Sequence, residues 1–426
     1  MRRGRGIIGG SLGRDLCDRG FCDHGLIRNK MDIQKLDQQY ILPTYARREI
    51  VFEHGAGSKL YDAKGREYID FTSGIGVNCL GHGNTKLAVA IASQATRMIH
   101  CSNLYLVKNQ AIAAEKLAKL CEKAMGGAPK IFFANSGAEA NECAIKLARK
   151  WGEPRGKFEI ITLRNSFHGR TIATLAATAQ DKFHEHFAPF PAGFVYAENL
   201  AQVRELITEK TAAVMIEPIQ GEGGIAPLDF AELKSLSEFL ARRELLLIAD
   251  EIQCGVFRSG KFMACELSGA KPQIATFAKA LAGGVPIGAC AATLDGVFAS
   301  GDHGSTFGGN PLSTAAMNAV LEVLESHFKS GALASAIKSF DAELKTLLSD
   351  YKSLFTASCG VGLMRSLVAK TPEIQKQIID AAHDRGVLVL RAGADHIRFL
   401  PPLTIADLEI HEGFSRLSAA CEFVSA

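Results

Sequence analysis

Between Lys130 and Ala249 the chain alternates short, continuously apolar runs with longer stretches of helical periodicity. The runs have the length of strands, and the longer stretches suit helices that bury one face. The predicted order is strand 130–134, helix 138–151, strand 159–163, helix 171–178, strand 212–217, helix 230–243 and strand 245–249. Strands that are apolar at every position are typical of a mostly parallel sheet with helices on both faces. The sequence therefore predicts an α/β core.

The segments on either side of this core are less regular. Alternating apolar residues around an Asp-Ala-Lys-Gly turn predict a hairpin in residues 59–70, and residues 86–98 have helical periodicity. Asn310 and Pro311 form a helix start, as N-cap and first helical residue, and mark a predicted domain boundary. That helix is expected to reach Lys329, followed by helix 332–351, strands 360–368, 387–390 and 396–400, and helix 408–424.

Charge and cysteine content exclude several classes of protein. Lys and Arg number 48 against 45 Asp and Glu, and this net charge of +3 is too balanced for a nucleic-acid or membrane-surface binder. No uncharged apolar run reaches the roughly 18 residues that a membrane-spanning helix needs. The 11 cysteines are scattered without paired spacings, which fits a reducing compartment and predicts a cytoplasmic location.

The first 30 residues differ from the rest, because they are rich in Arg and Gly and lack apolar periodicity. Their acidic residues argue against a transit peptide, and no apolar stretch suits a secretory signal. Cys17, Cys22 and His24 are clustered, but a zinc site needs a fourth ligand, so we predict no metal site. We interpret residues 1–30 as a disordered extension, or as the product of a start codon placed too early, with Met31 as the working start.

A small, glycine-containing turn follows the strand predicted at 130–134. Ser136 and Gly137 stand just before the predicted helix 138–151. The unpaired N–H groups at a helix start, together with the positive end of the helix dipole, favour a phosphate. Ser136 adds a hydroxyl, and Gly137 lets a ligand approach the backbone closely. The alternative is an N-cap in a tight turn without a ligand.

Two charged residues stand in mainly apolar surroundings. Asp250 follows the strand predicted at 245–249, and ligands of open α/β sheets bind at that carboxyl edge. A carboxylate there can keep the ring nitrogen of a pyridine cofactor protonated. The alternatives are a strand-end Asp with protein partners, or a magnesium ligand of a nucleotide enzyme, although the chain has no GxxxxGK[ST] motif.

Lys279 is the second charged residue in mainly apolar surroundings. Its apolar and small neighbours lower the pKa of a lysine and favour the neutral amine that forms a Schiff base. Alone, this pattern is more typical of a helix-end lysine whose charge reaches solvent. Combined with the phosphate turn and with Asp250, which lies 29 positions earlier, it indicates a site for pyridoxal phosphate (PLP).

The order of these motifs resembles the fold-type I, class-III (ω-amino acid) aminotransferases, and within them the acetylornithine aminotransferase group. The resemblance is collinear from Leu42 to Ile405, and its motifs are Gly74–His82, Ala134–Leu147, Ser166–Arg170, Ile216–Gly224, Asp250–Gly260, Ala278–Lys279, His303–Pro311 and Ile397–Leu403. It implies a large PLP-binding domain, residues 86–310, with a mostly parallel sheet flanked by helices. A smaller α+β domain would combine residues 31–85 with a linking helix and C-terminal part in residues 311–426.

The resemblance also implies which residues hold the cofactor. Lys279 would bind PLP as a Schiff base and act as general acid and base, while Asp250 would pair with the ring nitrogen. The remaining cofactor contacts would be Ser136, Gly137 and Ala138 at the phosphate, Phe167 stacked on the ring, Gln253 at the phenolic oxygen, and Thr306 reaching the phosphate from the other subunit of a homodimer.

Four residues match substrate contacts of the family. Arg170 and Ser305 would contact the substrate, and Arg398 would bind the α-carboxylate of glutamate or 2-oxoglutarate. Glu222 would mask Arg398 while an ω-amino donor binds, and would swing away when the dicarboxylate arrives. The alternative is a static salt bridge, since a structural ion pair can occur in the same place.

The implied reaction transfers the ω-amino group of N-acetylornithine to 2-oxoglutarate, giving a semialdehyde and glutamate, in arginine or lysine biosynthesis. Ornithine, succinylornithine and succinyldiaminopimelate are alternative donors. Cys254 and Phe257 depart from the residues commoner in this family and are expected to affect the pocket wall. An aminomutase could share this fold, but Arg398 and Glu222, as a switch between two substrates, disfavour it. A non-catalytic PLP-binding protein is disfavoured by the combined presence of Lys279, Asp250, Arg170 and Arg398.

Overall fold

The computed structural model describes residues 33–426, so the predicted extension 1–30, its cysteine cluster and Met31 lie outside the described residues. The chain divides into two compact units, the first ending at Val51 and the second starting at Phe52. In the first unit, helix α2 (Ile33–Tyr40) is followed by irregular chain, and Arg47 Nη1 pairs with Asp37 Oδ1 at 2.7 Å. All elements described below belong to the second unit.

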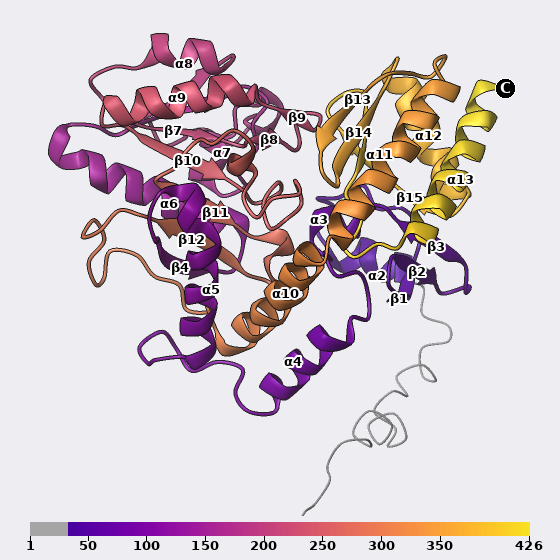
Figure 1. Cartoon of the computed structure of the whole chain (residues 1–426), viewed down its shortest axis with the longest axis horizontal. Helices are drawn as coiled ribbons and strands as arrows, with labels where there is room; N and C mark the ends of the chain where they lie inside the picture. The colour runs from indigo at the N-terminus through magenta and orange to yellow at the C-terminus, as the bar shows by residue number, and fades with distance from the viewer. Residues whose placement is uncertain (1–32) are drawn as a thin grey trace, which may run out of the picture. The chain divides into compact units, whose positions relative to one another are not determined.

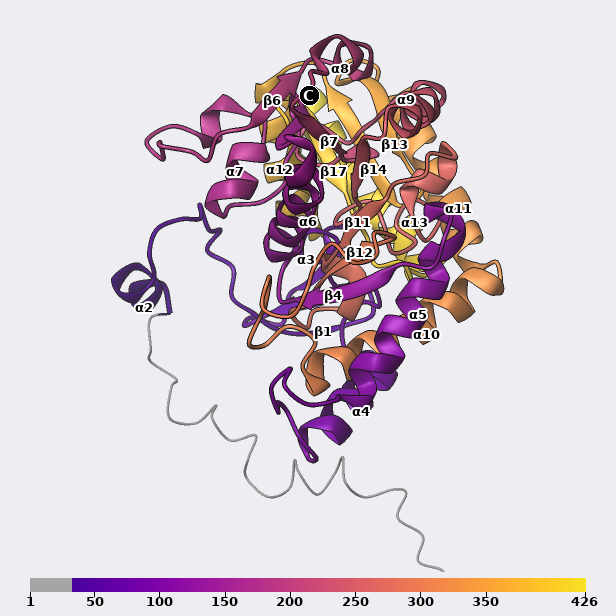
Figure 2. The same ribbon diagram turned by 90° about the vertical axis from the view of Figure 1, so that its left-hand side faces the viewer.

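The centre of the second unit is a seven-stranded sheet (Figures 1 and 2). Its strands, in spatial order, are β4 (Lys130–Ala134), β12 (Gly288–Ala292), β11 (Ile274–Phe277), β10 (Leu246–Asp250), β7 (Thr211–Ile216), β5 (Glu159–Leu163) and β6 (Phe194–Ala197). Neighbours are parallel except at β12, which is antiparallel to both β11 and β4. The mostly parallel sheet that the sequence predicts is therefore confirmed.

Helices cover both faces of this sheet. They include α5 (Lys108–Met125), α6 (Gly137–Gly152), α7 (Ile172–Ala177), α8 (Leu200–Leu206), α9 (Phe230–Arg242) and α10 (Pro311–Lys329), while α4 (Thr85–Ala95) packs against α10. Ile160 of β5 and Ile248 of β10 belong to the apolar cluster that contains α6 residues. The next residue of β5, Ile161, and the preceding residue of β10, Leu247, pack with α8 and α9 instead. Since successive strand residues face opposite sides, strands covered on both faces have no polar side.

Residues from both ends of the second unit form two smaller sheets. The first contains β1 (Phe52–Ala56), β2 (Lys59–Asp62), β3 (Glu67–Asp70) and β15 (Val387–Leu388), and the second β13 (Phe355–Val361), β14 (Met364–Ala369), β17 (His396–Phe399) and β16 (Leu390–Ala392). Their helices are α3 (Ser73–Gly76), α11 (Ala332–Asp350), α12 (Pro372–Asp384) and α13 (Asp407–Ser425). The antiparallel pairing of β2 with β3 confirms the predicted hairpin. The domain boundaries at 85/86 and 310/311 stay predictions.

Two of the predicted C-terminal strands are wrong in extent. Residues 360–368 belong to a hairpin of β13 and β14 rather than to one strand, because Gly362 takes a left-handed φ of 63° at its turn. Residues 387–390 divide between two sheets, since β15 pairs with β3 and β16 pairs with β17. Apolar periodicity does not reveal where a run of residues passes from one sheet to another.

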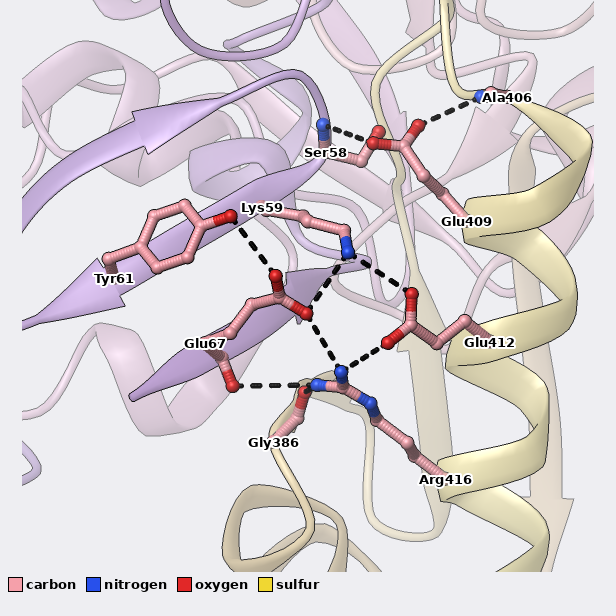
Figure 3. Close-up of polar contacts among 9 residues, drawn as sticks. All are labelled: Ser58, Lys59, Tyr61, Glu67, Gly386, Ala406, Glu409, Glu412 and Arg416. Carbon is pink, nitrogen blue, oxygen red and sulfur yellow. Dashed lines mark hydrogen bonds and ion pairs between the residues drawn. The ribbon is translucent and has the colours of Figure 1, made fainter. Parts of the chain in front are cut away.

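A network of ion pairs fastens the β2–β3 hairpin to α13 (Figure 3). The Glu67 carboxylate accepts from Lys59 Nζ at 3.0 Å and from Arg416 Nη2 at 2.8 Å, while Lys59 also pairs with Glu412 at 3.2 Å. Arg416 Nη1 donates to the Gly386 carbonyl at 2.8 Å. Burial raises the pKa of Glu67, but the hydrogen bonds from Lys59 and Arg416 outweigh it and hold this pKa below its ordinary value. The first strands and last helix are thus joined by charged hydrogen bonds.

Two further properties concern the described part of the chain. None of the helices in residues 33–426 combines the length and apolar character needed to cross a membrane. The cysteines in the same range are free thiols, and most of them are buried.

Candidate active site

A cavity of about 450 Å³ lies at the carboxyl edge of the large sheet. Ser136 follows β4, Phe167 follows β5, Asp250 ends β10 and Lys279 follows β11, and these four strands run parallel to one another. The carboxyl ends of parallel strands meet at one edge, where α/β proteins bind ligands. The predicted site residues in the cavity lining are Ser136, Gly137, Ala138, Phe167, Arg170, Asp250, Gln253 and Lys279.

The phosphate turn is built at the start of α6. Ser136 is its N-cap, and Ser136 Oγ accepts from Glu139 N at 3.2 Å. A Cβ at Gly137 would lie 2.9 Å from the Ile252 side chain, so packing as well as ligand access requires glycine there. A Cβ at Gly288 would lie 2.1 Å from the Ser136 carbonyl oxygen, so β12 can approach the turn only through a glycine. The helix start is therefore held rigidly beside the cavity.

Asp250 is buried at the end of β10 with its carboxylate fully oriented. Asp250 Oδ2 accepts from Asn141 Nδ2 and contacts His168 Nδ1, both at 2.8 Å, while Oδ1 accepts from Ile252 N at 3.1 Å. Asn141 is itself fixed, because its Oδ1 accepts from Thr276 Oγ1 at 2.7 Å. His168 and Asn141 lie inside motifs that the sequence analysis singled out, but their role beside Asp250 was missed.

Lys279 lines the cavity in a strained backbone conformation. Its φ of 44° lies in the left-handed region, which costs a non-glycine residue about 1–3 kcal/mol. Removal from water lowers the pKa of its amine, the nearby Glu222 carboxylate opposes this change, and Arg398 adds to it. A lowered pKa increases the share of neutral amine, which is the nucleophilic form.

A second buried carboxyl group, Glu217, lines the cavity and was also missed. Its two oxygens accept from the backbone N–H groups of Phe167 at 2.8 Å and Gly221 at 3.1 Å. Burial raises the pKa of Glu217 to about 7, against the opposing effect of His168. Glu217 therefore ties together the backbone segments that carry Phe167 and Glu222.

Glu222 and Arg398 lie beside the cavity rather than in its lining. Arg398 Nη1 donates to Glu222 Oε1 at 2.5 Å and to Gln253 Oε1 at 3.2 Å. Burial raises the pKa of Glu222, but Arg398 outweighs this effect and the net pKa is lower than usual. Because Gln253 lines the cavity, the ion pair is one side chain away from it.

Arg170 lines the cavity, is exposed, and lies beside two aromatic rings. Its guanidinium carbon is 4.1 Å from the ring centre of Phe183 and 5.5 Å from that of Phe167. Phe183 comes from the short helix Asp181–Phe183, which sequence reasoning left unassigned.

Four other residues singled out by the sequence are not part of the cavity lining. Ser305 and Thr306 belong to the loop before α10, where Ser305 Oγ accepts from Asn135 Nδ2 at 3.1 Å and Thr306 is exposed. Cys254 and Phe257 are buried outside the lining, so any effect on the cavity wall is indirect and stays a prediction. Cys254 Sγ instead donates to the Glu251 carboxylate at 3.4 Å, and the Phe257 ring packs 5.3 Å from that of Phe262.

Comparisons with known proteins agree with this architecture. The Aminotransferase class-III family model matches residues 43–421. An acetylornithine aminotransferase of Wolinella succinogenes is 52% identical over 391 residues, covering 91% of this chain and 98% of that protein. The ornithine aminotransferase of Toxoplasma gondii, with PLP partially occupying its active site, has a TM-score of 0.85 at 29% identity, covering 92% and 94% of the two chains. The N-acetylornithine aminotransferase of Stenotrophomonas maltophilia has a TM-score of 0.77 at 35% identity, covering 92% and 99%.

These similarities confirm the predicted fold class, and the cavity fits the cofactor of such enzymes. Asp250 offers a buried carboxylate to a pyridinium nitrogen, the start of α6 offers N–H groups to a phosphate, and Lys279 lies on the wall of the same cavity. The chain therefore belongs to the class-III aminotransferase family and uses pyridoxal phosphate as its cofactor.

Proposed function

We propose that this aminotransferase moves the ω-amino group of N-acetylornithine to 2-oxoglutarate, giving a semialdehyde and glutamate, in arginine biosynthesis in the cytoplasm. The observation that carries the two-substrate reaction is the Glu222–Arg398 pair, 2.5 Å long, next to the cavity. The 52% identity to an acetylornithine aminotransferase supports the choice of donor. Lysine biosynthesis, with a succinyldiaminopimelate donor, is the second setting.

The cavity residues divide the work on the cofactor. Asp250 would keep the ring nitrogen protonated, Phe167 would pack on the ring face, and Gln253 would bind the phenolic oxygen. Ser136, Gly137 and Ala138 would bind the phosphate through the start of α6. Bound PLP would supply an electron sink for the carbon that carries the transferred amine. Lys279 Nζ would serve as the general base and acid beside that carbon.

Glu222 resolves a conflict between the two substrates. An ω-amino donor brings an ammonium group without a neighbouring carboxylate, whereas 2-oxoglutarate brings a carboxylate to the same position. Arg398 suits the second ligand and repels the first. Pairing with Glu222 masks its charge until the dicarboxylate replaces the carboxylate of Glu222.

Replacing Glu222 with Gln unmasks Arg398 permanently. The KM for 2-oxoglutarate is expected to fall and the KM for the amino donor to rise, each by about tenfold, equivalent to ~1.4 kcal/mol. Steady-state kinetics with each substrate varied in turn measures both values. Glu412→Gln is the matched control. Glu412 also pairs with an arginine, Arg416, but neither of these two residues lines the cavity. Equal changes in both KM values would indicate a static salt bridge.

We assign Thr306 to the active site of a second copy of the chain. Its loop is joined to the segment 100–107 by hydrogen bonds from Asn103 Nδ2 to Ser305 O and Gly308 O, at 2.9 and 2.8 Å. These two segments carry large exposed apolar residues, namely Leu104, Leu106 and Phe307, exposed by 87%, 104% and 61%. An apolar surface of this kind marks an interface between proteins. The proposed homodimer would cover it and bring Thr306 to the partner's phosphate.

A panel of amino donors tests the substrate. Acetylornithine, ornithine, succinylornithine and succinyldiaminopimelate are each supplied with 2-oxoglutarate, and glutamate is measured. We expect the largest kcat/KM with acetylornithine and no glutamate without 2-oxoglutarate. If another donor gives a higher kcat/KM, that donor is the substrate instead of acetylornithine. Turnover that does not require 2-oxoglutarate would indicate an aminomutase. The absence of turnover with every donor would indicate a non-catalytic PLP-binding protein.

A further inference from the structure

The orientation of Arg170 depends on aromatic rings. Within residues 33–426, no carboxylate, hydroxyl or carbonyl group accepts a hydrogen bond from its guanidinium. Its close neighbours are instead the rings of Phe183 and Phe167, at 4.1 and 5.5 Å from the guanidinium carbon. A cation above an aromatic face is attracted by the ring, while its in-plane N–H groups stay available.

The Phe183 ring is held firmly enough to orient another side chain. Its edge meets the Phe167 ring at a centroid distance of 5.8 Å and an interplanar angle of 77°, a favourable T-shaped arrangement. Phe183 N donates to the Gln180 carbonyl at 3.0 Å, and the next residue, His184, contacts the Leu175 carbonyl through Nε2 at 2.9 Å. The ring is thus anchored through its own backbone, a neighbouring ring and the adjacent residue.

An aromatic holder has a chemical advantage over a carboxylate at this position. A carboxylate would orient the guanidinium but would also occupy its donors and neutralise its charge. Phe183 orients the guanidinium but leaves its donors free and its charge unneutralised. A substrate carboxylate can then be bound through two parallel N–H···O bonds.

We propose that Phe183 is a positioning residue that holds Arg170 ready for a substrate carboxylate and so sets the affinity for carboxylate-bearing substrates. The proposal rests on the proposed contact between Arg170 and the substrate. Because Phe183 is outside the cavity lining and touches it only through Phe167 and Arg170, its loss should change binding more than the chemical step.

The test compares Phe183→Leu and Phe183→Tyr in the holoenzyme. Leucine keeps most of the apolar volume but removes the aromatic ring face, whereas tyrosine keeps the ring face. Phe183→Leu is expected to raise the KM for the amino donor about fivefold with kcat changed less than twofold, and Phe183→Tyr to restore the KM. Calorimetric titration with glutarate, a dicarboxylate that cannot react, should show the same fivefold loss of affinity for Phe183→Leu. Lys182→Gln is the matched control, because it removes a different cation near the same ring, at 4.9 Å, and should leave both values unchanged.

Two further variants separate this proposal from the proposed role of Arg170. In an Arg170→Ala background, Phe183→Leu should add no further loss of glutarate affinity, since the ring then has nothing to orient. If Arg170→Ala raises the donor KM but Phe183→Leu does not, Phe183 is not a positioning residue and the role of Arg170 stands. If Arg170→Ala changes neither KM nor glutarate affinity, the role of Arg170 is wrong. A Phe183→Leu variant that lowers kcat and glutarate affinity equally in both backgrounds would indicate general damage to the fold and overturn the proposal.

Discussion

Replacing Lys279 with Ala lowers kcat by about 10⁴-fold, the upper end of what a positioned proton-transferring side chain contributes. Lys279 is the amine on the cavity wall, and its lowered pKa increases the neutral form that can accept a proton. Alanine has no group that can bind the cofactor covalently or move a proton. Single-turnover kinetics and the visible absorbance of the cofactor measure the loss. Full turnover in the variant would contradict the assignment of this cavity as the active site.

The Lys279→Ala variant should not be less stable toward unfolding than the wild type. A lysine whose folded pKa lies below its unfolded value destabilises the fold at pH values below that folded pKa, and the penalty disappears as pH rises toward the unfolded value. Lys279→Ala removes the penalty, so the thermal midpoint of the cofactor-free protein at neutral pH should stay level or rise. Lys130→Ala, at an exposed lysine that pairs with Asp295, is the control with unchanged turnover.

The sequence predicts the parts of the fold whose physics is local. β4 and β5 are apolar or β-branched along most of their length, and the predicted ranges 130–134 and 159–163 match the observed strands. The Asn310 N-cap with Pro311 predicts the start of α10 to the residue. Asp250 and Lys279 could be chosen as candidates because each is a charge in apolar surroundings, and the parallel sheet explains why such distant positions meet at one edge.

Other parts could not be predicted because their causes lie far away in the chain. β12 reads Gly-Ala-Cys-Ala-Ala, which has no β-branched or aromatic residue, and it is a strand because β4 and β11 flank it. His168, Asn141 and Glu217 look like ordinary polar residues within motifs, and their importance comes from burial beside Asp250 or Phe167. Cys254 departs from the residue commoner in the family, but the sequence could not show that its side chain turns to Glu251 rather than into the cavity.

Replacing Asp250 with Asn lowers kcat by about 10³-fold, comparable to the loss of one preorganised electrostatic group in an active site. An amide cannot hold a positive charge on the ring nitrogen, so the cofactor becomes a weaker electron sink. Asparagine keeps the shape of the side chain and the acceptor for Ile252 N, while its Nδ2 replaces the oxygen that accepts from Asn141 Nδ2. Rapid-mixing kinetics of each half-reaction should show the loss in both, because both need the same protonated ring.

The choice of Asn over Ala, and a control at Glu251, separate this effect from damage to the fold. Asp250→Ala would remove the side-chain acceptor for Asn141, His168 and Ile252 N, and each buried polar group left without a partner costs about 1–3 kcal/mol. Glu251 is equally buried, holds the backbone N–H groups of Ala264 and Cys265 at 2.8 and 2.9 Å, and does not line the cavity. Glu251→Gln should therefore reduce stability, by about 1–3 kcal/mol for an unsatisfied buried group, while kcat stays within a few-fold. If Glu251→Gln slowed both half-reactions as strongly as Asp250→Asn, the loss would come from packing around β10 rather than from the charge at the ring nitrogen.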